Sequence, residues 1–156
     1  MQRYLYLLLI AVCFSSCGKI LLEKKYTKKL LGNWRITEVK LTSGQTIYPN
    51  YNFKDQRFSF KDDYTQTLIN PGNKSFEDKW DVYVETEKQD CYTAPAGNTV
   101  CRDVDIINLY ALAWIPTTQE TKKIEFRYVE FLSGDRFKAT IIPNPVTSFE
   151  YYFKRE

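Results

Sequence analysis

The sequence predicts an all-β protein, built as an antiparallel meander of about eight strands. Tyrosine and phenylalanine are abundant, with 12 and 10 residues, and aromatic residues favour strands over helices. From Gly32 onward, apolar and polar residues alternate with a period of two, and short turn segments with Gly, Pro, Asn or Asp separate the alternating stretches. Because about eight strands suffice to close a sheet on itself, we expect a barrel.

The first half of the predicted sheet begins with three short strands, NWRITEVKL, RFSFK and YTQTLIN. Asp62 and Asp63 separate the second from the third and suit a tight turn, so we interpret them as turn residues rather than as paired acids. The next turn is NPGNKS.

The middle of the chain predicts two longer strands. In KWDVYVET, Trp80, Val82 and Val84 share one face. Residues 87–100 are expected to form a loop. The apolar run in DVDIINLYALAWI is long enough for a helix, but its neighbouring isoleucines and the absence of helix caps favour a strand.

The last three predicted strands are KIEFRYVEF, RFKATII and FEYYFKRE. The first alternates strictly, which places Ile124, Phe126 and Tyr128 on one face, and the turn SGD joins it to the second. Phe149, Tyr151 and Phe153 alternate in the third.

The first 16 residues have the features of a leader. A short positive region with Arg3 precedes an apolar run of 11 residues, Tyr4 to Phe14, which is about half the length that spans a membrane. Ser15 and Ser16 then precede Cys17. This arrangement resembles a bacterial lipobox and implies a lipid such as palmitate on Cys17; an ordinary signal peptide and an uncut anchor are the alternatives.

The resemblance to exported lipoproteins implies a location in the cell envelope, anchored in the outer membrane. Gly18 and Lys19 follow Cys17 without an acidic run, and by the same resemblance this favours the periplasmic side. Residues 17–29 are expected to form either an extended tether or a short amphipathic helix with Leu22, Tyr26 and Leu30 on one side.

Two cysteines remain beyond the leader and Cys17. Cys91 and Cys101 form an even pair in an exported chain, so we expect a disulfide that closes a short loop. A pair of thiolate metal ligands is the alternative, but it needs further ligands and the chain has no histidine.

The composition argues against several functions. A formal net charge of +3 offers no basic face for nucleic acid. Without histidine, and without nucleophile, phosphate-binding or dinucleotide motifs, the sequence predicts no enzyme, no metal and no cofactor. Asp103 and Asp105 are the least implausible acids, and salt-bridged or solvated carboxylates are the preferred interpretation.

Gly32, Asn33 and Trp34 form a G-x-W at the first predicted strand. With the leader and the ending YYFKRE, this resembles the lipocalin-like domain lipoproteins of the Bacteroidota, over residues 30–156. The resemblance implies that Trp34 closes one end of a barrel, that Gly32 lets the preceding segment cross beneath it, and that Arg155 or Lys154 stacks on the indole.

A lipocalin-like barrel implies a small hydrophobic ligand inside it. The residues expected to face inward and to line such a site are Phe58, Phe60, Trp80, Val82, Phe126, Tyr128, Phe137, Ile141 and Tyr151. A barrel packed by these side chains is the other interpretation. The alternative function is then a protein–protein or inhibitory contact made through loops such as the one between Cys91 and Cys101.

Overall fold

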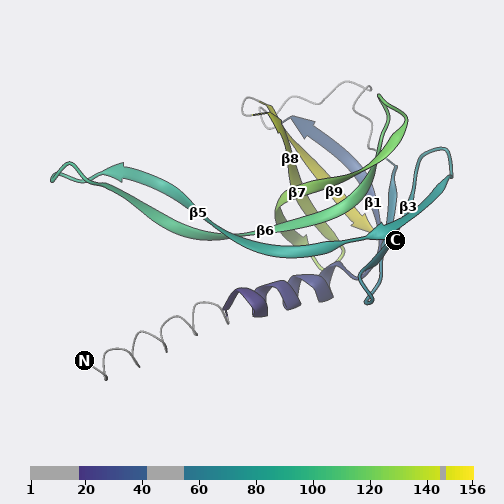
Figure 1. The fold of residues 1–156 in the computed structure, drawn as a ribbon, viewed down its shortest axis with the longest axis horizontal. Helices are drawn as coiled ribbons and strands as arrows, with labels where there is room; N and C mark the ends of the chain where they lie inside the picture. The colour runs from purple at the N-terminus through teal and green to yellow at the C-terminus, as the bar shows by residue number, and fades with distance from the viewer. Residues whose placement is uncertain (1–17, 42–54, 145–146) are drawn as a thin grey trace.

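The computed structural model describes residues 18–41, 55–144 and 147–156 of the chain. One helix covers residues 18–30, and antiparallel strands form the rest of the fold (Figure 1). The strands are β1 (Gly32–Leu41), β2 (Arg57–Phe60), β3 (Thr65–Ile69), β4 (Ser75–Lys79), β5 (Asp81–Thr93), β6 (Thr99–Ile115), β7 (Glu120–Ser133), β8 (Arg136–Asn144) and β9 (Thr147–Arg155).

The described strands form one nine-stranded sheet in the order β4-β3-β2-β1-β9-β8-β7-β6-β5. Every neighbouring pair is antiparallel, so the predicted meander is confirmed, and β1 joins its first part to its last by pairing with both β2 and β9. The sheet has one strand more than the sequence predicts. The extra strand, β4, is mostly exposed and therefore lacks the alternating burial that marks a strand in a sequence.

The expectation that residues 87–100 form a loop is wrong. β5 continues to Thr93 and β6 begins at Thr99, so the two strands pair through most of that segment. Residues 85–105 thus form a long hairpin, here called the arm, which projects away from the remaining strands (Figure 1). Main-chain hydrogen bonds hold the two strands of the arm together. Because their side chains are mostly exposed, the sequence lacks the apolar alternation from which a strand is predicted.

The core lies on the inner face of the curved sheet. Alternate residues of almost every strand are buried there, as in the run Leu109, Ala111 and Ala113 of β6 and the run Phe149, Tyr151 and Phe153 of β9. This period of two is the one that the sequence predicts.

Tyr128 departs from the predicted alternation. The pairing of β7 with β8 shifts register between Arg127 and Glu130, and Tyr128 has a positive φ of 53°. The extra residue of this bulge reverses the alternation, so Val129 is buried in the core while the Tyr128 hydroxyl bonds to Glu87 on the arm. The expectation that Tyr128 belongs to the inward-facing set is wrong.

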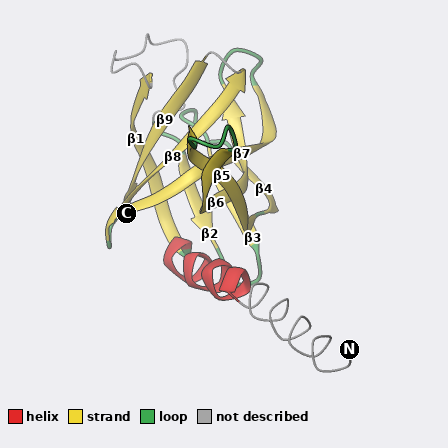
Figure 2. Cartoon of the chain, turned by 90° about the vertical axis from the view of Figure 1, so that its left-hand side faces the viewer, coloured by secondary structure: helices red, strands yellow, loops and turns green. Residues whose placement is uncertain are grey.

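The helix packs against the sheet by the apolar side that the sequence indicates (Figure 2). Leu30 is fully buried, and Leu22 and Tyr26 pack against the core. Glu23 accepts a hydrogen bond at 3.1 Å from the backbone N–H of Val84, on the edge strand β5. Of the two expectations for this segment, the helix is the one observed.

The leader and Cys17 lie outside the described residues. The described part of the chain contains no helix with the length and apolar character of a membrane span.

Candidate functional site

The structure brings most of the residues expected to face inward into one cluster. Trp80, Val82 and the others of the set are buried, Ile141 is partly buried against them, and Tyr128 is outside the cluster. The buried members are Phe58, Phe60, Trp80, Val82, Phe126, Phe137 and Tyr151.

The aromatic rings of this cluster contact one another in a continuous series. Phe60 lies 4.9 Å from Trp80 and 5.9 Å from Phe58, measured between ring centroids. Phe153 continues the series, 5.7 Å from Phe58 and stacked on Phe137 at 4.2 Å. Such edge and stacked contacts stabilise aromatic pairs beyond their buried area, and these rings occupy the space between the strands that they join.

Two buried glutamines bridge β6 and the β2–β3 part of the chain. The Gln66 amide donates to the carbonyl of Leu112 at 2.7 Å and accepts from its N–H at 2.8 Å. The Gln56 amide does the same with Trp114, at 2.7 and 2.9 Å. Each amide thereby makes the two backbone hydrogen bonds that a residue of a neighbouring strand would make. The bonded residues lie on a stretch of β6 that does not pair with β5.

The sequence patterns do not single out these two glutamines, which are structural positions that join β6 to the β2–β3 part of the chain. Gln56 and Gln66 stand two residues before Phe58 and Leu68, on the inward face, and both have 0% exposure. A polar residue at an inward position of an alternating strand is the signal that would have found them, since a buried amide needs partners.

The end of the sheet near the helix is built around Trp34. Its indole N–H donates to the carbonyl of Leu30 at 2.6 Å, and the guanidinium of Arg155 lies 4.3 Å from its ring centroid. Arg155 also donates to the carbonyls of Leu31 and Lys29, at 2.7 and 2.9 Å. Of the two basic residues considered from the sequence, Arg155 is therefore the one that stacks on the indole.

Gly32 is required at this end. It has a φ of +110°, and a Cβ there would lie 2.7 Å from the Nη1 atom of Arg155. Any side chain would therefore be strained and would displace the guanidinium.

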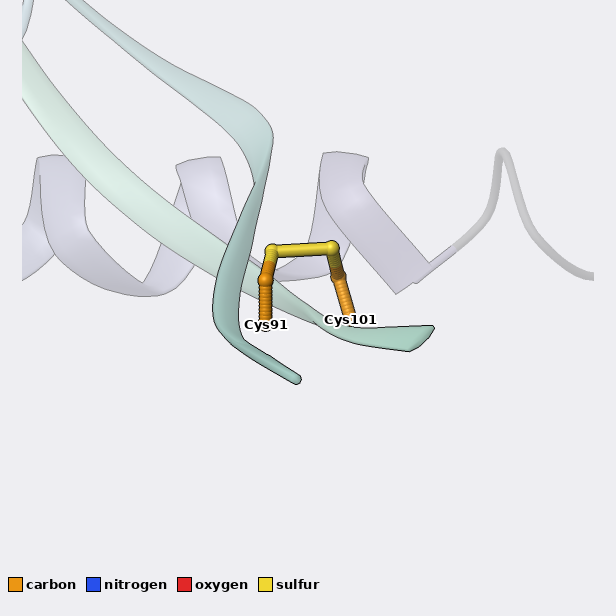
Figure 3. Close-up of a disulfide and its surroundings, with 2 residues drawn as sticks. All are labelled: Cys91 and Cys101. Carbon is orange, nitrogen blue, oxygen red and sulfur yellow. A yellow bond between two sulfur atoms is a disulfide. The ribbon is translucent and has the colours of Figure 1, made fainter. Parts of the chain in front are cut away.

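The arm carries the disulfide that the sequence predicts. Cys91 and Cys101 are joined near its tip, with an S–S distance of 2.07 Å (Figure 3). Tyr92 and Val100 are direct cross-strand partners next to this bridge, with exposures of 61% and 42%. The tip therefore presents an apolar pair on a covalently closed ribbon.

A polar network braces the root of the arm against β7. The guanidinium of Arg127 contacts Glu87 and lies 3.3 Å from Glu85, both on β5. Tyr128 donates to Glu87 at 2.7 Å. The bulge that carries Tyr128 outward thus supplies a second contact between β7 and the arm.

Tyr83 extends this network. Its hydroxyl donates to Glu125, and the Nε atom of Arg127 lies 3.8 Å from the same carboxylate. Burial and the hydrogen bond to Glu125 raise the pKa of Tyr83 to about 12, because both disfavour the phenolate.

Each of the two acidic pairs named in the sequence, Asp62 with Asp63 and Asp103 with Asp105, has a member that accepts hydrogen bonds from a nearby threonine. Asp63 accepts from the N–H and the hydroxyl of Thr65, so it stabilises the turn between β2 and β3. Asp105, on the exposed arm, accepts from the hydroxyl of Thr86 at 2.7 Å. Within residues 18–41, 55–144 and 147–156, no group of three or more acidic or cysteine side chains is placed to hold a metal ion.

No protein-family model matches the chain, and neither a curated protein nor a solved structure is significantly similar to it.

Proposed function

We propose that this protein is a lipid-anchored protein of the bacterial envelope that binds a protein partner through its arm. The single observation that carries the proposal is the arm itself, a disulfide-closed ribbon that projects from the sheet (Figure 1). An isolated two-stranded hairpin is only marginally stable in water. The arm is stabilised at both ends, by the disulfide near its tip and by Arg127 and Tyr128 at its root.

The arm has the properties of a binding element. β5 is the last strand of the sheet, and the ladder between β6 and β7 begins only at Leu109, so neither edge of the arm pairs with another described strand. Its 21 residues include five acidic and two basic side chains, a net charge of −3. A partner with a basic surface and room for Tyr92 and Val100 fits this element, and the closed loop has already lost much of its conformational entropy.

A closed, lipocalin-like barrel is part of the same proposal. The two glutamine bridges to β6 support closure, because they satisfy backbone groups that an open sheet would leave to water. The arrangement of Gly32, Trp34 and Arg155 supports the lipocalin-like assignment.

Photo-crosslinking in the envelope of living cells tests the partner role. A photoreactive residue replaces Val100 at the tip or, as a control, Leu132 of β7, which is 49% exposed. We expect a discrete adduct from position 100, none from position 132, and loss of the adduct in a folded Cys91→Ser/Cys101→Ser variant. Equal adducts from both positions, or none from position 100, would contradict the proposal.

A small hydrophobic ligand remains a second proposal, and one observation favours it. Leu41, Phe149 and Ile141 are neighbours across three adjacent strands, on the inner face and far from Trp34. Leu41 and Ile141 are only partly buried, so, among the described residues, this end of the inner face has apolar surface left to cover.

Displacement of a fluorescent fatty acid tests this second proposal. We expect Leu41→Asp to weaken probe binding and Lys40→Asp, on the opposite face, to leave it unchanged. Protein that neither binds the probe nor carries a co-purified apolar molecule would count against the ligand.

Labelled palmitate tests the anchor. We expect the label to enter the wild-type protein and a Cys13→Ala variant but not Cys17→Ala. A Cys17→Ala variant that still anchors would disprove lipidation at this cysteine.

A further inference from the structure

A cleft on the outer side of the sheet lies where the β4–β5 junction meets β6 and β7. Its volume is about 540 Å³, and it is lined by Tyr64, Lys79, Trp80, Asp81, Tyr110 and Lys123. It is separate from the arm and shares only Trp80 with the buried cluster of the inner face, and its lining residues come from four different parts of the chain. This volume falls within the range of small-molecule sites, about 300–1,000 Å³.

Two aromatic rings are presented to solvent at this cleft. Tyr64 is 46% exposed and Tyr110 is 41% exposed. Among the described residues only one other tyrosine, Tyr92 on the arm, is exposed to this degree. Two of the three exposed tyrosines in the described part of the chain therefore line one cleft.

The Tyr64 ring is held in place rather than free. Its backbone has a φ of 60°, in the left-handed region that a bulky residue rarely adopts. The ring lies 5.8 Å from that of Trp80, and the indole N–H of Trp80 donates to the carbonyl of Lys61 at 3.1 Å. This conformation belongs to the turn between β2 and β3, where the N–H of Tyr64 donates to the carbonyl of Lys61 at 3.2 Å.

The polar groups of the cleft are two ammonium ions and a carboxylate. The Nζ atom of Lys123 lies 5.9 Å from the Tyr110 ring centroid and 3.5 Å from the carboxylate of Asp78. Lys79 donates one hydrogen bond, to the carbonyl of Asp63 at 3.2 Å. Since an ammonium has three N–H donors, both lysines retain donors for a ligand.

Asp81 supplies the acceptor. Its Oδ1 atom accepts from the N–H of Val82 at 2.8 Å, which fixes the carboxylate beside Tyr110, its cross-strand partner. The lining residues carry two positive charges and one negative charge, and Asp78 beside Lys123 offsets the second positive charge, so the cleft offers charged donors and acceptors rather than a net charge.

We propose that this cleft binds a saccharide that carries a carboxylate. The apolar C–H faces of a sugar ring would pack on the two exposed tyrosines, and Asp81 would accept from sugar hydroxyls. Lys79 and Lys123 would pair with the sugar carboxylate, which distinguishes an acidic sugar from a neutral one. A wholly apolar ligand would desolvate these charged groups without offering them a partner.

Titration calorimetry on the mature chain tests the proposal, with trigalacturonate as the probe and galactotriose as its neutral counterpart. The two site variants are Tyr110→Ala and Lys123→Gln. Their matched controls are Tyr92→Ala, the exposed tyrosine on the arm, and Lys122→Gln, a neighbouring exposed lysine paired with Glu120. Far-ultraviolet circular dichroism and the melting temperature establish that each variant is folded.

We expect trigalacturonate to bind, galactotriose to bind at least about tenfold more weakly, and each site variant to lose at least about tenfold in affinity. Both controls should bind as the wild type does. Lys123→Gln alters only the end of a partly exposed side chain and should leave the fold intact. If Tyr110→Ala fails to fold, the affinity of Lys123→Gln for trigalacturonate still tests the proposal.

Several results would overturn the proposal. They are the absence of trigalacturonate binding at millimolar concentrations, equal affinity for the neutral trisaccharide, displacement by inorganic phosphate, and unchanged affinity in Lys123→Gln. The cleft does not involve the arm, so failure here leaves the crosslinking result unaffected.

Discussion

Replacing Gln66 by alanine removes the amide that bridges β3 to β6. Gln66 has 0% exposure, and its side chain is the partner of both the N–H and the carbonyl of Leu112. A buried polar group left without its partner costs about 1–3 kcal/mol. With two groups orphaned, and with some water reaching them, we expect Gln66→Ala to lower the free energy of unfolding by about 3 kcal/mol.

Urea and thermal unfolding measure this loss. For a chain of this size, about 3 kcal/mol corresponds to a fall in melting temperature on the order of 10 °C. Gln89→Ala, on the partly exposed arm, is the matched control and should change stability by less than about 0.5 kcal/mol.

Gln66→Glu separates hydrogen bonding from packing, because it keeps the shape of the side chain. An ionised carboxylate can accept from the N–H of Leu112 but repels its carbonyl, so the introduced group should have a raised pKa in the folded state. Its protonated form can make both bonds. Stability should therefore be greatest below about pH 4 and fall as pH rises through the raised folded pKa.

Two results would refute this reasoning. The first is a Gln66→Ala variant as stable as the wild type, which would mean that the bridge contributes nothing to the fold. The second is a Gln66→Glu variant whose stability, relative to the wild type, does not improve on acidification.

Three further predictions concern the ends of the fold and the arm. Arg155→Met should lower stability by about 2 kcal/mol in urea unfolding, since it removes the stacking on Trp34 and two hydrogen bonds; a loss no greater than that of Lys154→Met would contradict it. In the Cys91→Ser/Cys101→Ser variant, the amide hydrogens of the arm should exchange up to about 100-fold faster, because the disulfide between two cysteines 10 residues apart no longer closes the loop. Unchanged exchange rates would show that main-chain pairing alone holds the arm. Tyr83 should ionise late in an alkaline absorbance titration, near its pKa of about 12. Because that pKa is raised on folding, the contribution of Tyr83 to stability is complete below about pH 10 and is lost as pH rises toward 12. A Tyr83→Phe variant that shows the same late ionisation step would disprove the assignment.

Strands with one buried face could be predicted from the sequence. RFSFK and FEYYFKRE alternate because burial selects every second residue, and the pattern survives without knowledge of the partner strands. For residues 18–30 a helix and an extended tether were both open, and the structure shows the helix, in which Leu22, Tyr26 and Leu30 pack as their spacing of four indicates. The pairing of Cys91 with Cys101 followed from counting cysteines.

The arm and β4 could not be predicted in this way. Their strands have little or no buried face, so their side chains are free to vary while main-chain pairing holds the ribbon. The outward position of Tyr128 could not be predicted for a related reason. The bulge beside it shifts the alternation by one residue, and the shift leaves no mark in the sequence because Tyr128 and Val129 are neighbours that could each occupy a buried position.

By itself the sequence determined the class of the fold, the buried face of most strands and the two cysteines that pair. These features depend on local periods and on chemistry that is present in the residues themselves. Only the tertiary structure decided that two glutamine amides meet the backbone of β6, that residues 85–105 project as an arm, and that two exposed tyrosines share a cleft with two lysines. Each of these depends on which distant segments become neighbours, and that is set by the register of the whole sheet rather than by any one stretch of the chain.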